Sequence, residues 1–172
     1  MEAVKICLFC VGSAILYGVL HDQITAHVCV EYFSVGHPTI LPLTSPFWLA
    51  MQWGIVATWW VGLSLGILLA AAARLGNWPR VSIQYLRRPI LALLMAMAAT
   101  STIAGLGGFL LAANGKVSLV GWLANAIPPN AHARFIADWW AHSAAYLIGI
   151  VGGLVLCVWI FLTRRRLAAT SN

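Results

Sequence analysis

The histidines and acidic residues of this chain are few, and they are unevenly distributed. Its 172 residues include five histidines and four acids. All the histidines and three of the acids lie within residues 21–37 or 132–142. Imidazole and carboxylate groups are ligands of Zn, Fe, Mn and Cu, so this distribution suggests a metal site. The residues concerned are His21, Asp22, His27, Glu31, His37, His132, Asp138 and His142.

A divalent-metal site is the sharpest hypothesis for these residues. Asp138 and His142 are four residues apart, so on a helix they share one face and can reach one ion. The sequence contains neither H-E-x-x-H nor E-x-x-H, which excludes the usual metalloprotease and di-iron patterns. The expected ligands are His21, Asp22, Asp138 and His142, with Glu31 and His37 as secondary ligands from the intervening loop.

Three other interpretations stay open. His21 and His142 are candidate axial ligands of a haem b group between helices. Asp138 and His142 are candidates for a proton relay in a small transporter. The third interpretation is a polar network that only fastens the structure, with Arg134 bonded to Asp138, Asp138 to His21, and Gln52 to a loop carbonyl. The further members expected in that network are Gln52, Arg134 and Tyr146.

The elements that hold these residues must be membrane helices. The chain is 62% hydrophobic and only 8% charged, and its mean hydropathy is +0.89. A soluble domain is about 25% charged, so this composition excludes one. A membrane helix needs about 20 apolar residues. The expected spans are residues 4–20, 47–73, 89–113 and 131–162, joined by loops 21–46, 74–88 and 114–130 and followed by a tail at 163–172.

The positive charges predict the orientation of the spans. Eight of the ten lysines and arginines lie at the N-terminus, in the middle loop or in the tail. Loops rich in Lys and Arg stay in the cytoplasm, so we expect both termini inside and the histidines and most acids outside. The expected location is the cell membrane, as a multi-pass protein of the bacterial cytoplasmic membrane. The expected partners are the lipid bilayer and either further copies or a larger membrane complex, and no nucleic acid.

Small residues predict how the helices pack. Glycines let two helix backbones approach closely where lipid removes the hydrophobic drive for association. We therefore expect an all-α, up-down bundle of four transmembrane helices. The glycines expected at its interfaces are Gly62, Gly66, Gly105, Gly108, Gly149 and Gly153.

The first outer loop is long for a connection between packed spans, and long loops are often functional. Apolar and polar residues alternate from Ile24 to Phe33, which favours a short β-strand. Pro38, Pro42 and Pro46 then keep the chain extended, as in a lid across the bundle. Two function classes remain: a protein with a metal or haem site at the outer surface, and a structural or accessory subunit of a membrane complex.

Overall fold

The computed structural model describes residues 1–170, and that range contains helices and no strand. Short elements lie at the end of the molecule away from the termini: α2 (Val30–Ser34), α6 (Trp122–Ala126) and a 3₁₀ turn (Pro129–Ala131). The longer helices are α1 (Glu2–Val28), α3 (Pro46–Val56), α4 (Trp59–Arg74), α5 (Ile83–Ala113) and α7 (His132–Thr170).

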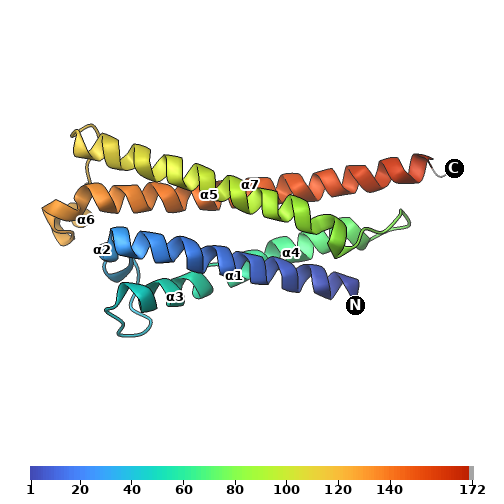
Figure 1. Ribbon diagram of the computed structural model, residues 1–172, viewed down its shortest axis with the longest axis horizontal. Coiled ribbons are helices and arrows are strands. Elements are labelled where there is room, and N and C mark those ends of the chain that lie inside the picture. Colours follow the sequence, from blue (N-terminus) through green and yellow to red (C-terminus); the bar gives the residue numbers. More distant parts are fainter. Residues whose placement is uncertain (171–172) are drawn as a thin grey trace.

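Four helical segments are long and apolar enough to cross a membrane: α1, α3 with α4, α5, and α7 with its preceding turn. They form two layers, with α5 against α7 in one and α1 against α3 and α4 in the other (Figure 1). Both chain ends and the connection between α4 and α5 lie at the same end of the molecule (Figure 1). Large apolar side chains such as Leu16, Met95 and Val155 are exposed on the exterior, which suits a lipid-facing surface.

The strand expected at Ile24–Phe33 is wrong. α1 continues to Val28, the chain bends at Cys29, and α2 follows directly. The buried residues of this stretch lie three or four apart in the sequence, which is the period of a helix. The alternation of apolar and polar residues therefore coincided with a helical pattern, whose buried members are Asp22, Thr25, Ala26, Cys29 and Phe33.

The second span is not one continuous helix. It is interrupted at Ala57 and Thr58, between α3 and α4. The Thr58 hydroxyl donates a hydrogen bond to the carbonyl of Gly54, one turn earlier. Threonine bonded to the preceding turn bends helices, which accounts for the interruption.

Two other helices are longer than expected. α5 begins at Ile83, before Pro89, because the Glu2 carboxylate accepts a hydrogen bond from the Ile83 amide. α7 continues to Thr170, beyond the expected end at 162. Its extension packs on the α4–α5 connection through Arg164, whose side chain is 1% exposed. That guanidinium donates hydrogen bonds to the carbonyls of Ala72, Leu75, Trp78 and Pro79.

Backbones approach most closely where α1 meets α3. A Cβ on Gly18 would lie 2.6 Å from the Gly54 carbonyl oxygen, and a Cβ on Gly54 would lie 2.6 Å from the Val19 Cα. Neither site has room for a side chain, and the contact fixes α1 one turn from His21. This pair is absent from the expected set of glycines. The expected glycines lie at helix contacts as follows: Gly62 and Gly66 against α1, Gly105 and Gly108 against α7, Gly149 against Met97, and Gly153 against Leu65.

Candidate functional site

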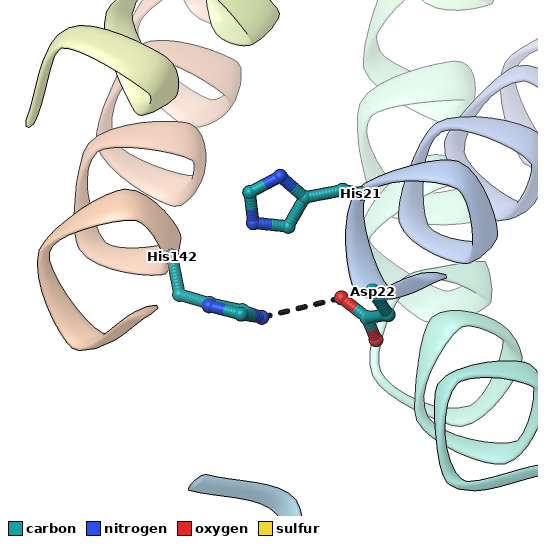
Figure 2. A group of neighbouring side chains, drawn as sticks. All are labelled: His21, Asp22 and His142. Carbon is teal, nitrogen blue, oxygen red and sulfur yellow. Dashed lines mark hydrogen bonds and ion pairs between the residues drawn. The ribbon is translucent and has the colours of Figure 1, made fainter. Parts of the chain in front are cut away.

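Three side chains from the two layers converge toward the ends of the helices that lie away from the chain termini. His21 and Asp22 come from α1, and His142 comes from α7 (Figure 2). One potential ligand atom from each residue lies within 4.8 Å of the other two. Two ligands of one ion at about 2.1 Å can be at most about 4.2 Å apart, so the three atoms are slightly farther apart than one ion requires. Asp22 and His142 are 6% and 8% exposed, respectively.

The hydrogen bonds of His142 define its role. Its Nδ1 lies 2.8 Å from the main-chain oxygen of Asp138, one turn earlier on α7. A carbonyl oxygen only accepts, so the Nδ1 atom carries the proton and donates it. Nε2 of a neutral His142 therefore presents a lone pair, and it lies 3.2 Å from Oδ1 of Asp22. Two facing lone pairs need a positive charge between them, either a proton or a metal ion.

His21 adds a second imidazole with unused capacity. Its ring packs on His142, with centroids 4.5 Å apart and planes at 71°. Its Nε2 is buried and has no hydrogen-bond partner within residues 1–170. Leaving a buried polar atom without a partner costs free energy, so this nitrogen is available to a ligand.

The segment after α1 covers the cluster with aromatic side chains. Tyr32 of α2 stacks on His142, with centroids 4.5 Å apart. Phe33 packs edge-on against the same imidazole and is 2% exposed. This cover separates one side of the cluster from solvent. The covering segment is the helix α2. The sequence pattern that could have predicted it is the helical spacing of the residues that became buried, rather than the alternation of apolar and polar residues.

The secondary ligands proposed from the loop do not join the cluster. His37 donates a hydrogen bond from Nδ1 to the Tyr32 carbonyl oxygen, 2.8 Å away, and its ring packs against Trp53. Burial lowers the pKa of His37 below its usual range. Glu31 accepts a hydrogen bond from the Cys29 thiol at 3.3 Å, and burial raises the pKa of that thiol to about 12. These contacts hold the side chains of Glu31 and His37 in the segment that follows α1. Both lie outside the metal-ligand group found in the described residues.

Asp138 also lies outside that ligand group. It is 2% exposed, and its Oδ2 has no hydrogen-bond partner among the described residues. The expected bonds from Arg134 and to His21 are therefore not formed at this oxygen. Buried Gln52 Oε1 likewise has no partner within residues 1–170. The expected bond to a loop carbonyl would be donated by the Gln52 amide nitrogen and stays a prediction. The contribution of Asp138 to the cluster is its main-chain oxygen.

Two cavities meet at the cluster. One, of about 120 Å³, lies between the two layers and is lined by His21, Asp22, His142 and Tyr146 at one end. The other, of about 450 Å³, lies between α1 and the outer parts of α5 and α7. Arg134, Asp138 and His21 line this second cavity. His21 is thus reached from both sides, which leaves room for a further ligand beside the three side chains.

The arrangement fits a metal ion better than a haem. Axial imidazoles with metal–nitrogen bonds of about 2.1 Å would place their ring centroids about 6 Å apart on a common axis. The rings of His21 and His142 are closer and oblique. Two histidines and one carboxylate, with a further position open, are instead the donor set of many catalytic zinc and non-haem iron sites. Comparison with known proteins finds no family model, no curated protein and no solved structure that matches this chain.

Proposed function

We propose that this chain is a multi-pass protein of the bacterial cytoplasmic membrane that binds a divalent metal ion and uses it for chemistry at the outer surface. The proposed ligands are His21, Asp22 and His142. The observation that carries the proposal is the 3.2 Å contact between Nε2 of His142 and Oδ1 of Asp22, which requires a proton or a cation between the two atoms. A divalent cation satisfies both atoms and also the free nitrogen of His21.

The surroundings of the cluster support a metal rather than a proton. Histidine ligands of metals commonly donate their second N–H to a carbonyl oxygen, as His142 does to Asp138. A proton shared by Asp22 and His142 would satisfy those two atoms but would leave Nε2 of His21 without a partner. The adjacent cavities supply an access path and space for a water or substrate at the open position.

The proposed orientation depends on charge. The start of α1, the end of α4, the α4–α5 connection, the start of α5 and the end of α7 together carry eight of the ten lysines and arginines. These segments lie at one end of the molecule (Figure 1). Cytoplasmic loops are enriched in Lys and Arg, so that end is placed inside. The proposed metal site then lies near the outer edge of the membrane, where its polar side chains have access to water.

An architectural role is the alternative. The hydrogen bond between Asp22 and His142 joins α1 to α7 and so connects the two layers. In that case the chain would be a structural or accessory subunit of a membrane complex. The two functions differ in whether purified protein holds a metal.

Metal content distinguishes the metal-binding function from the architectural role. Protein purified in detergent, stripped with a chelator and reloaded with zinc should retain about one ion per chain after dialysis. Separate substitutions His21→Ala, Asp22→Asn and His142→Ala should each lower zinc affinity by at least about tenfold, because each removes one ligand. Elemental analysis measures the retained metal.

His27→Ala is the matched control. This histidine also belongs to α1 but is exposed, and its Nδ1 hydrogen-bonds to the Gln23 carbonyl at 2.7 Å. The control variant should hold as much zinc as the unmodified chain. Zinc retention that is equal in all four variants, or absent from the unmodified protein, would contradict the proposed site. Loss of folding in metal-free variants would support the architectural role.

A further inference from the structure

The smaller cavity is a long apolar space within the bundle. It lies between α1 and α4 on one side and α5 and α7 on the other. Along α1 its lining extends from Cys10 to His21, which corresponds to about 16 Å of helix. Along α7 it extends from His142 to Leu156, about 21 Å of helix. A volume of about 120 Å³ over this length describes a narrow slot.

The chemistry of the slot changes from one end to the other. Its inner part is lined by aliphatic groups, including Leu65, Leu93 and Ile150. A buried apolar cluster that includes Ile6, Leu69 and Ile160 closes the inner end. Its outer end contains the candidate metal ligands. An occupant that satisfies both ends must have an apolar chain and a polar head.

The helices around the slot also provide a way in from the side. α1 packs chiefly against α3 and α4, and α5 packs chiefly against α7. Contact between α1 and α5 is sparse, and the larger cavity lies along this seam. A molecule dissolved in the bilayer can therefore reach the slot without crossing water.

We propose that the slot binds a single-chain lipid, with its hydrocarbon chain along the inner walls and a small uncharged head at the candidate metal ligands. The inference rests on the proposed function in assigning this lipid as the substrate class of the metal site. An apolar space of similar size in a protein stays dry and accepts hydrocarbon groups, which makes a water-filled slot unfavourable. The head would take the position left open beside the three proposed metal ligands, because His21, Asp22 and His142 all line this end of the slot.

Photolabelling in lipid nanodiscs tests the inference. The probe is hexadecanol that carries a diazirine midway along its chain, in phosphatidylcholine discs, with labelled residues mapped by mass spectrometry. We expect labels on the slot residues of α5 and α7, such as Leu93 and Ile150. Excess hexadecanol should compete for these labels, whereas excess hexadecane, which lacks the head, should not.

Two variants of α1 form a matched pair. Ser13 lines the slot, and Ser13→Phe places a bulky ring in the path of the hydrocarbon chain. Gly12 is exposed, and a Cβ there would meet no atom within 4 Å, so Gly12→Phe places the same ring outside. Slot labelling should fall at least about tenfold in Ser13→Phe and stay within about twofold in Gly12→Phe.

Metal content measured on the same samples separates the two proposals. Slot labelling without any bound metal would support lipid binding and overturn the metal site. Bound metal with labels confined to the exterior, or with slot labels unchanged by Ser13→Phe, would overturn lipid binding and leave the metal site standing. Competition by hexadecane as strong as that by hexadecanol would show bilayer hydrocarbon filling the slot and would also overturn the inference.

Discussion

At the residue scale, the main chain of Asp138 has more influence on the cluster than its carboxylate. The Asp138 carbonyl accepts the Nδ1 proton of His142 and thereby turns the lone pair of Nε2 toward Asp22. The Asp138 carboxylate is buried, and one of its oxygens has no partner in the described chain. The spacing of Asp138 and His142 predicted that they share a helix face, but spacing does not indicate whether a main-chain or side-chain oxygen makes the contact.

Asp138→Asn separates these contributions. The amide has the shape of the carboxylate and leaves the main chain unchanged, so zinc affinity should stay within about threefold. Removing a buried carboxylate with an unpaired oxygen should raise the free energy of unfolding by about 1 kcal/mol. Zinc titration and thermal unfolding in detergent measure the two effects. A loss of zinc affinity as large as that of Asp22→Asn would instead make the Asp138 side chain a ligand.

The sequence predicted only in part which candidate residues lie close together. The concentration of His21, Asp22 and His142 near the outer helix ends followed from counting along apolar spans. The exclusion of Glu31 and His37 did not follow, because it depends on the bend at Cys29 and on packing against Trp53. Contacts between distant segments of this kind have no local sequence signal.

At the scale of elements, α2 is the part of the structure that most affects access to the cluster. It is a short helix, and Tyr32 and Phe33 hold it on His142 by ring contacts. A helix of five residues is not stable by itself, so its position depends on this packing. Whether α2 is closed over the cluster in the folded protein can therefore be tested directly.

Cys29, at the junction of α1 and α2, reports on this cover. Its thiol is 1% exposed, and its pKa is raised to about 12 by burial. Since the thiolate is the reactive form, we expect maleimide to modify Cys29 at pH 8 at least about 100-fold more slowly than an exposed cysteine. Mass spectrometry of peptides measures the rate.

Ser34→Cys supplies the exposed comparison, because residue 34 belongs to α2 and faces solvent. Tyr32→Ala, which removes a stacking ring, should accelerate the reaction of Cys29. Equal rates at Cys29 and at the introduced cysteine would show that the α2 cover is open.

At the scale of the whole molecule, hydropathy was sufficient to predict four long apolar helical segments. It did not predict where the helices end, because those limits depend on tertiary contacts. The run Arg164-Arg165-Arg166 led to the expectation of a cytoplasmic end. In the structure Arg164 is buried, whereas Arg165 and Arg166 are exposed. Only the fold distinguishes the three.

Arg164→Ala should therefore destabilise the fold. It removes hydrogen bonds to four carbonyls that tie α7 to the α4–α5 connection. We expect the free energy of unfolding to fall by about 3 kcal/mol, since bonds to a charged donor are strong and the carbonyls lose their partner. Thermal unfolding in detergent measures the change. Arg165→Ala, which removes an exposed charge, should change stability by less than about 0.5 kcal/mol.

A comparable loss in both variants would indicate that positive charge alone stabilises this end of the molecule. Arg164→Lys makes the same distinction. The lysine ammonium keeps the charge but lacks the planar guanidinium fork that reaches all four carbonyls. It should resemble Arg164→Ala in stability more than it resembles the unmodified chain.

The central claim is that a metal ion lies between His142 and Asp22 with His21 as the third protein ligand. X-ray absorption at the zinc edge of the reloaded protein tests it most directly. The claim predicts nitrogen and oxygen ligands at about 2.0–2.1 Å with scattering from two imidazoles, reduced to one in His142→Ala. A spectrum of hydrated zinc without imidazole scattering, or one unchanged by His142→Ala, would contradict it.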